Sequence, residues 1–171
     1  MRRKKLPSLS ALENKLDRLF SEWVRKSAAD EGGTVECVTC RKLMFWTGDG
    51  AQAGHFIKRQ HRATRWDERN VGVQCIRCNK WLDGNEGEYG DYIIRKYGVE
   101  VHQELFRLKR TIKKFSRVDL QEMIDYYKNK LETLNELQVR STDGPSEVQE
   151  RPRPDGLPDL PMLLRTEGES G

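Results

Sequence analysis

Four cysteines form two pairs, each with two residues between its members. The pairs are Cys37-Val-Thr-Cys40 and Cys75-Ile-Arg-Cys78. Thiolates are soft ligands, and four of them on two such turns suit one tetrahedral zinc ion. The spacing therefore predicts a structural zinc site. In zinc-finger peptides such a site contributes about 10–16 kcal/mol of apparent binding energy, which becomes folding energy.

The cysteines have two alternative roles. Two disulfides would form in a secreted protein, but the first residues, MRRKKLPSLS, contain no apolar signal-peptide core. A thiol redox function is typical of a strand–helix–strand context, which neither pair has. Metal binding in a reducing cytoplasm is the favoured interpretation.

The segment between the two pairs is longer than in a simple zinc ribbon. Cys40 and Cys75 are separated by 34 residues, whereas plain ribbons have about 15–20. The segment contains His55 and Asn70, and Asn79 directly follows the second pair. The zinc is therefore predicted to join the two ends of an inserted unit that carries these polar residues.

The order of these polar residues resembles the HNH, or ββα-metal, endonucleases. In that family a histidine ends the first strand, an asparagine lies in the following loop, and a His or Asn lies in the helix. The resemblance implies an α+β fold, with a zinc-clamped ββα unit between N-terminal and C-terminal helices. It also implies that His55, Asn70 and Asn79 occupy the catalytic positions.

These residue types fit hydrolysis of a phosphodiester, the reaction that the resemblance implies. A neutral imidazole such as that of His55 accepts a proton from water near pH 7. The amide oxygen of Asn79 suits a catalytic Mg²⁺ or Mn²⁺ ion, which stabilises charge on the phosphate and binds the leaving oxygen. By analogy, Asn70 hydrogen-bonds the loop backbone and holds the strand of His55 in place.

One position departs from the HNH pattern. The residue before the motif histidine is usually Asp or His and supplies a second metal ligand, but here it is Gly54. Candidates for a substitute ligand are His61, Asp67 and Asn85. In the other interpretation Asn79 is the only protein ligand, with waters and phosphate completing the shell.

A longer stretch is similar to a narrower family, the phage recombination nucleases called NinG or Rap. The similarity is carried by AGHFIKRQHRATRWDERNVGVQCIRCNKWLDGNEGEYGDYIIRKYG. These proteins have AGH[FY], R[FW]DERNV, QCxxCN and LxGN segments before a helix that ends in YG. The similarity extends over about residues 12–137.

This second resemblance implies a structure-selective endonuclease that acts on branched recombination intermediates, such as Holliday junctions or D-loops. The implied location is the cytoplasm of an infected or lysogenic bacterium. The competing interpretation is a non-catalytic zinc module that binds branched DNA, and Gly54 is the observation in its favour. Oligomeric state is open, and a homodimer is compatible with the sequence.

Basic residues surround the predicted site and would neutralise and position DNA phosphates. They are Lys58, Arg59, Arg62, Arg65, Arg69 and Arg77. Trp66 and Trp81 lie among them and have the chemistry to stack on unpaired bases, although core positions are the favoured interpretation. No groove-reading motif is evident, so recognition of DNA structure is expected rather than of sequence.

Hydrophobic periodicity predicts the elements that must position these residues. A Ser10-x-x-Glu13 capping box fits the first helix. Another helix is expected to begin near Cys75, and the later helices are expected to pack together and against the first one. The remaining predictions are a helix over 8–27, strands over 43–46 and 53–57, a polar loop over 59–70, and helices over 86–97, 99–114 and from Ser116.

The composition changes near residue 141. Residues 141–171 hold five of the six prolines, three basic and seven acidic residues, so the chain before them carries most of the positive charge. We expect a disordered tail, whose apolar stretch 157–164 is compatible with docking to a recombination protein. No apolar run is long enough for a membrane helix. The predicted divisions are 1–34 (basic segment and helix), 35–85 (nuclease core), 86–140 (C-terminal helices) and 141–171 (tail).

Overall fold

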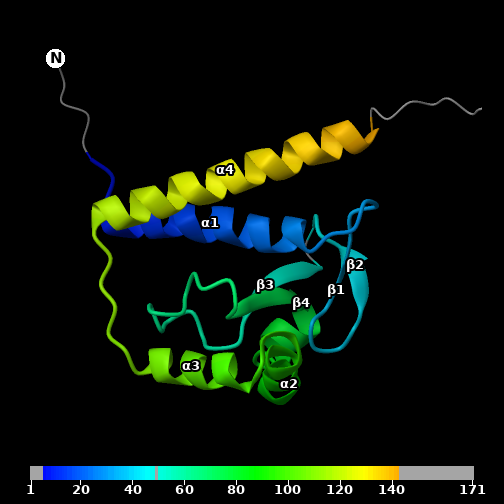
Figure 1. Cartoon of the computed structure of the whole chain (residues 1–171), viewed down its shortest axis with the longest axis horizontal. Coiled ribbons are helices and arrows are strands. Elements are labelled where there is room, and N and C mark those ends of the chain that lie inside the picture. Colours follow the sequence, from blue (N-terminus) through cyan, green and yellow to red (C-terminus); the bar gives the residue numbers. More distant parts are fainter. Residues whose placement is uncertain (1–5, 49, 143–171) are drawn as a thin grey trace, which may run out of the picture.

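The computed structural model describes residues 6–48 and 50–142, with side chains up to residue 137. Figure 1 shows the β3–β4 strand pair at the centre, with helices α1 and α4 on one side and α2 and α3 on the other. The predicted acidic tail lies outside the described residues, apart from its first two positions, which belong to α4. None of the described helices is long and apolar enough to cross a membrane.

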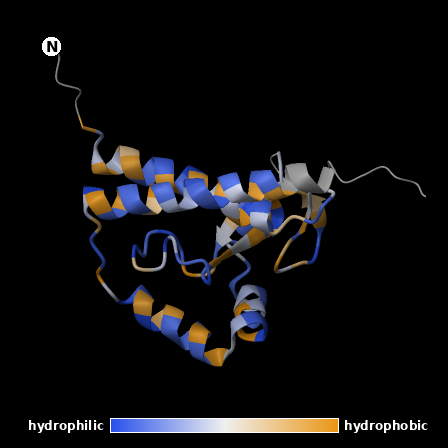
Figure 2. Cartoon of the chain, turned by 45° about the horizontal axis from the view of Figure 1, so that its top comes forward, coloured by the Kyte–Doolittle hydropathy of each residue, from blue (hydrophilic) through white to orange (hydrophobic). Residues whose placement is uncertain are grey.

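Helices α1 (Leu9–Ser27) and α4 (Arg117–Thr142) lie side by side and run in the same direction (Figure 1). A hydrogen bond joins Arg117 to the Pro7 carbonyl at one end, and another joins Lys26 to Asn135 near the other end. Both helices alternate hydrophobic and hydrophilic residues, as Figure 2 shows. Their apolar faces meet in the main core, which contains Leu12, Leu16, Phe20, Val24, Leu120, Ile124 and Tyr127.

Two short antiparallel strand pairs carry the motif residues. Strands β1 (Thr34–Glu36) and β2 (Leu43–Phe45) flank the first cysteine pair. Strands β3 (Ala51–His55) and β4 (Val71–Cys75) pair so that Gly54 is opposite Gly72. The main core includes Ala51, Val71 and Val73 together with α1, so α1 covers one face of this pair.

The other face of β3–β4 is occupied by the second helix pair, α2 (Glu86–Tyr97) and α3 (Val99–Lys109). A separate apolar cluster joins these helices to the segment after β3, through Phe56, Ile57, Tyr89, Ile93 and Leu105. The Tyr89 hydroxyl donates a 2.7 Å hydrogen bond to the Gly54 carbonyl. Between β4 and α2 lies a single π-helical turn, η1 (Arg77–Trp81).

Several predicted elements agree with the structure, including α2, the polar loop before Asn70 and a helical turn near Cys75. The start of α4 is a capping box, because Ser116 and Asp119 exchange backbone-to-side-chain hydrogen bonds of 2.8 and 3.1 Å. The cap of α1 was predicted wrongly. Ser8, rather than Ser10, accepts the N–H of Ala11.

Two other predictions about the helices were wrong. The third helix was expected to reach residue 114, but α3 ends at Lys109 and Ile112 is 90% exposed. The later helices do not form one bundle, because α4 packs on α1 while α2 and α3 pack beyond the sheet (Figure 1). Strand β4, which carries five buried residues, was not predicted, because its pattern has no alternation to distinguish it from a buried helix.

Gly54 is required by the packing of a buried side chain from the paired strand. A Cβ atom at this position would lie 2.7 Å from Cδ of Gln74 and closer still to its Oε1. Gln74 is fully buried, and its Nε2 donates a 2.8 Å hydrogen bond to the Gly84 carbonyl. The carboxamide of Gln74 therefore occupies the space that a side chain at position 54 would need.

Replacing Gly54 with Ala should lower the free energy of unfolding by about 1–3 kcal/mol, the usual cost of overpacking. Gly87→Ala is the matched control, because a Cβ there meets nothing within 4 Å and the change should stabilise α2 by about 0.5–1 kcal/mol. Chemical denaturation of both variants measures the difference. Equal stability of Gly54→Ala and wild type would show that Gln74 moves aside freely.

Candidate catalytic site and metal centre

The four cysteines converge on one point, as a single metal site requires. Their sulfur atoms all lie within 4.8 Å of one another. Cys37, Cys75 and Cys78 are buried and Cys40 is exposed. The first pair lies in the turn between β1 and β2, and the second spans the end of β4 and the start of η1.

The sulfur distances suit zinc rather than disulfides. The Sγ atoms of Cys40 and Cys75 are 3.7 Å apart, close to the roughly 3.8 Å expected across a tetrahedron with Zn–S bonds of about 2.3 Å. A disulfide would require about 2.05 Å, and all four thiols are free. Both strand pairs are antiparallel, so the strand–helix–strand context of the redox alternative is also missing from the described chain.

Burial and local hydrogen bonds affect the cysteine thiols of the cluster unequally. Burial acts to raise the pKa of the Cys37 thiol, but hydrogen bonds from the Thr39 hydroxyl and neighbouring backbone N–H groups bring that pKa down to about 6. The N–H of Cys78 also points at the sulfur of Cys75, at 3.5 Å. Burial raises the pKa of the Cys40 and Cys78 thiols, so the hydrogen bonds favour the thiolate, the form that binds metal, at Cys37 alone.

Asn70 holds together the loop that follows β3. Its side chain is fully buried, and its Oδ1 accepts a 2.7 Å hydrogen bond from the N–H of Ile57. Its Nδ2 donates to the carbonyls of Ile57 and Thr64, both at 2.9 Å. The carboxamide therefore joins the loop backbone at residues 57 and 64, and hydrogen bonding to the loop backbone was predicted for this residue.

His55 ends β3, and its ring is oriented by the same loop. Nε2 lies 2.9 Å from the carbonyl oxygen of Arg65. A carbonyl only accepts hydrogen bonds, so Nε2 carries the proton and Nδ1 of the neutral ring is left as an acceptor. Burial lowers the pKa of His55 below its ordinary 6.5, opposed by the Arg65 carbonyl and Asp17 and assisted by the Arg59 guanidinium.

The loop is in turn fastened to α1 by ion pairs. Nε of Arg65 donates to Asp17 Oδ1 at 3.0 Å, and the indole N–H of Trp66 donates to the same oxygen at 2.9 Å. A second carboxylate, Glu13, pairs with Arg62 and Arg65. These bonds fix the backbone at residue 65, whose carbonyl orients the His55 ring.

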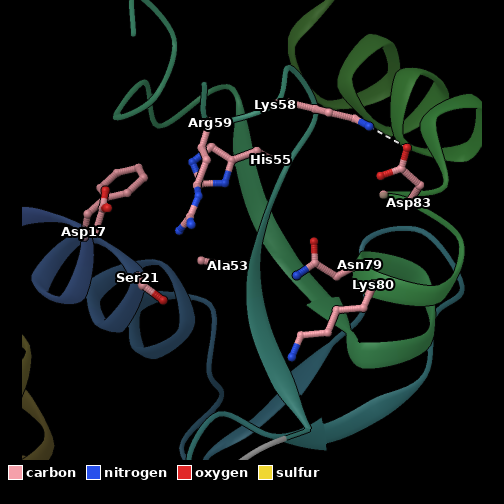
Figure 3. Close-up of a pocket in the computed structure, with 11 residues that line it drawn as sticks. Asp17, Ser21, Ala53, His55, Lys58, Arg59, Asn79, Lys80 and Asp83 are labelled. Atoms are coloured by element: carbon pink, nitrogen blue, oxygen red, sulfur yellow. Dashed lines mark hydrogen bonds and ion pairs between the residues drawn. The ribbon is translucent and has the colours of Figure 1, made fainter. Parts of the chain in front are cut away.

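His55 and Asn79 line one cavity of about 480 Å³ between α1, β3 and η1. In Figure 3 their side chains face this space from opposite sides, with Arg59 beside the imidazole and Lys80 extending from below. Nδ2 of Asn79 donates a 2.7 Å hydrogen bond to Gln52. Its Oδ1 has no such partner in the described structure and is available to a cation.

None of the predicted substitutes for the ligand missing at Gly54 lines this cavity. Nδ1 of His61 lies 3.0 Å from the Lys109 carbonyl. Asp67 forms an ion pair of 2.7 Å with Arg69. Asn85 occupies the N-cap position of α2.

Sequence reasoning did not single out several residues that line the cavity. Two are carboxylates: Asp17, held by Arg65, and Asp83, which pairs with Lys58 at 2.5 Å (Figure 3). The cationic side chain of Lys80, next to Asn79 in the chain, also lines the cavity. Adjacency to Asn79 was a signal for Lys80, whereas Asp17 lies 38 positions before His55 in the chain and carried no such signal.

The six basic residues predicted to contact DNA divide into two groups. Arg62, Arg65 and Arg69 are partly buried and form ion pairs with acidic residues of the protein. Lys58, Arg59 and Arg77 are exposed, although Lys58 also pairs with Asp83. The ion pairs give the first group a structural role, and contact of these three arginines with DNA stays a prediction.

The two tryptophans near the site have different environments. Trp66 is 6% exposed and packs edge-on against Phe115 at 5.2 Å between ring centroids. Trp81 is 76% exposed. The core interpretation is correct for Trp66 and wrong for Trp81, which follows Lys80 at the end of η1.

Together these features define a mixed α+β protein with small antiparallel sheets, five helices in its described part and a four-cysteine cluster suited to zinc. The family model described as Bacteriophage Lambda NinG protein matches residues 1–137. The chain therefore belongs to the NinG family. No curated protein and no solved structure matches it significantly.

Replacing Cys75 with Ser should remove the zinc and unfold the region around it. A structural zinc contributes about 10–16 kcal/mol, which is as large as the whole free energy of unfolding of a typical domain, about 5–15 kcal/mol. Loss of the zinc should therefore leave the region unfolded. Elemental analysis and thermal unfolding measure both effects, and a chelator should reproduce them in wild type. A Cys75→Ser protein that stays folded with one zinc per chain would contradict the four-cysteine site.

Replacing Asp17 with Asn should loosen the loop and lower the pKa of His55 further, because the carboxylate of Asp17 raises that pKa. The expected loss of stability is about 1.5–3 kcal/mol, the range for hydrogen bonds to charged groups. Titration of the His55 ring by NMR measures the shift. Glu22→Gln on the same helix is the control, because Glu22 is exposed and has no ion pair in the described structure; a His55 shift of equal size in both variants would exclude a specific role for Asp17.

Proposed function

We propose that this protein is a metal-dependent endonuclease that cleaves branched DNA during phage recombination. The observation that carries the proposal is the His55 ring, whose Nε2 is held by the Arg65 carbonyl while the ring lines a cavity shared with Asn79. This is the arrangement of a positioned general base beside an oxygen ligand. Membership of the NinG family adds the phage context.

In the proposed reaction, Nδ1 of His55 accepts a proton from the water that attacks the phosphorus. The lowered pKa keeps the imidazole neutral at pH 7, which is the form a base needs. The Arg65 carbonyl holds the ring as the proton arrives and stabilises the charged imidazolium through the Nε2 hydrogen bond. Asn70 supports this step only indirectly, by holding the loop that carries residue 65.

The residues of the cavity fit a hard divalent cation in part. Oδ1 of Asn79 is the free oxygen ligand, and Asp83 supplies a carboxylate at the rim once its pair with exposed Lys58 opens. Mg²⁺ bound there would stabilise negative charge on the phosphate and the leaving oxygen. Because Mg²⁺ usually keeps several waters and few protein ligands, the absence of a side chain at Gly54 is compatible with binding.

Exposed cations around the cavity support a polyanionic substrate. Lys58, Arg59 and Lys80 line it, and Arg77 is exposed on the same helical turn as Lys80. Such side chains contact phosphates whatever the base sequence. The proposed substrate is therefore recognised by its shape, and the proposed location is the bacterial cytoplasm where phage DNA recombines.

A non-catalytic module that binds branched DNA is the second candidate. It is favoured by the small ligand set of the cavity, in which the Asp17 carboxylate is already occupied by Arg65 and Trp66. A binder needs the exposed cations and the zinc cluster but has no use for an oriented base. Loss of cleavage on removing the His55 imidazole therefore separates the two candidates.

Replacing His55 with Ala should reduce cleavage of a four-way junction or D-loop by roughly 10²–10⁴-fold, the usual contribution of a general base. Zinc content, folding and DNA affinity should remain close to wild type. In wild type, kcat/KM should fall only below pH 6.5, because the pKa of His55 is lowered and the neutral base is lost as the pH drops through it. Assays with Mg²⁺ or Mn²⁺ on linear, flap, D-loop and junction DNA measure these effects.

Two results would overturn the nuclease proposal. Equal cleavage by His55→Ala and wild type would remove His55 from the chemistry. Tight junction binding by wild type without cleavage in either ion would favour the binding module.

A further inference from the structure

The turn η1 separates the catalytic cavity from a second hollow on its other side. Asn79 and Lys80 line the first, while Arg77 and Trp81 line the second. The second hollow measures about 270 Å³ and is also lined by Lys42, Met44, Gly50, Cys75 and Ile76. Its volume is slightly below the roughly 300–1,000 Å³ of pockets for drug-sized ligands, so it suits a smaller planar group.

Trp81 gives this hollow an unusual surface. The side chain is 76% exposed, although a tryptophan has more apolar area to bury than most residues. No aromatic contact in the described structure uses its ring, in contrast to Trp66, which packs on Phe115. An indole face is therefore open to a flat partner.

The charges around Trp81 indicate which partner. Arg77 and Lys42 line the hollow and are exposed, and none of its described lining residues is acidic. A flat apolar face between two cations matches a nucleobase and its flanking phosphates, because stacking tolerates any base. An apolar protein surface would gain nothing from the two cations.

We infer that Trp81 is a stacking platform for an unpaired base next to the scissile phosphate, and that it gives this site its selectivity for branched DNA. The inference rests on the proposed function of the cavity. Trp81 and Asn79 are two residues apart, so their Cα atoms are at most roughly 7.6 Å apart. A base stacked on Trp81 thus belongs within a few nucleotides of the phosphate beside His55, a place where paired DNA has no free base face.

The experiment measures binding in the full-length His55→Ala protein, so that cleavage does not consume the DNA. The probes are a fork with single-stranded arms and a fully paired duplex of the same length, with 2-aminopurine at the branch of the fork and at the same position of the duplex. Trp81→Ala should weaken binding to the fork by roughly 5- to 150-fold, the range for one base–aromatic stack, and leave duplex binding unchanged. The protein should quench 2-aminopurine in the fork, and Trp81→Ala should abolish this quenching.

Two variants control the experiment. Trp81→Phe keeps an aromatic face and should retain most of the fork preference. Tyr126→Ala removes another exposed aromatic, 52% exposed on α4, and should change neither affinity.

Three results would overturn the inference: equal loss on fork and duplex, quenching that survives Trp81→Ala, or a Trp81→Ala protein that changes oligomeric state instead of DNA preference. Since the test measures binding alone, it is distinct from the proposed catalysis. If the wild-type protein prefers forks through Trp81 but cuts no DNA, the stacking inference stands and only the proposed cleavage activity is excluded.

Discussion

The hydrogen bond between Nε2 of His55 and the Arg65 carbonyl is the interaction on which the candidate site depends. It decides which ring nitrogen carries the proton and which way the ring faces. A backbone carbonyl on a polar loop has no fixed position of its own, so the surrounding contacts must supply one. Asn70 closes the loop from inside, and Asp17 and Glu13 hold its arginines from α1. The first helix is thereby part of the site, although it contributes no residue of the HNH pattern.

The cysteine cluster and the loop stabilise opposite ends of the same strand pair. The cluster joins the β1–β2 turn to the end of β4, while Asn70 lies just before β4 begins and bonds to the segment just after β3 ends. Two-stranded pairs are marginally stable in water by themselves. Fixing both ends, and covering the faces with α1 and α2, keeps His55 at the end of β3 and Asn79 in η1 at a fixed separation. A few rigid restraints thus replace the large core that a chain with so many charged residues does not form.

The sequence was informative where residue type alone determines chemistry or backbone conformation. The paired cysteines predicted the cluster, and Gly98 and Ser116 marked helix ends that the structure has. It was less informative where the outcome depends on partners distant in the chain. The three arginines of residues 62–69 were predicted to bind DNA, which stays a prediction, but hydrophobic periodicity gave no sign of their ion pairs with Glu13, Asp17, Asp67 and Glu104. Trp81 was predicted to lie in the core because most tryptophans do, and its 76% exposure is evident only from the structure.

The glycine at position 54 and the glutamine at position 74 also constrain how the site can change over time. Because the carboxamide of Gln74 fills the space beside Gly54, an acidic ligand could enter position 54 only together with a smaller residue at 74. The smaller residue would break the hydrogen bond to the Gly84 carbonyl, next to Asp83 at the cavity rim. Either single change passes through a less stable protein, so the two positions are expected to be exchanged as a pair or not at all. Packing on the side of the strand that faces away from α1 therefore disfavours any side chain at position 54 as long as Gln74 is present.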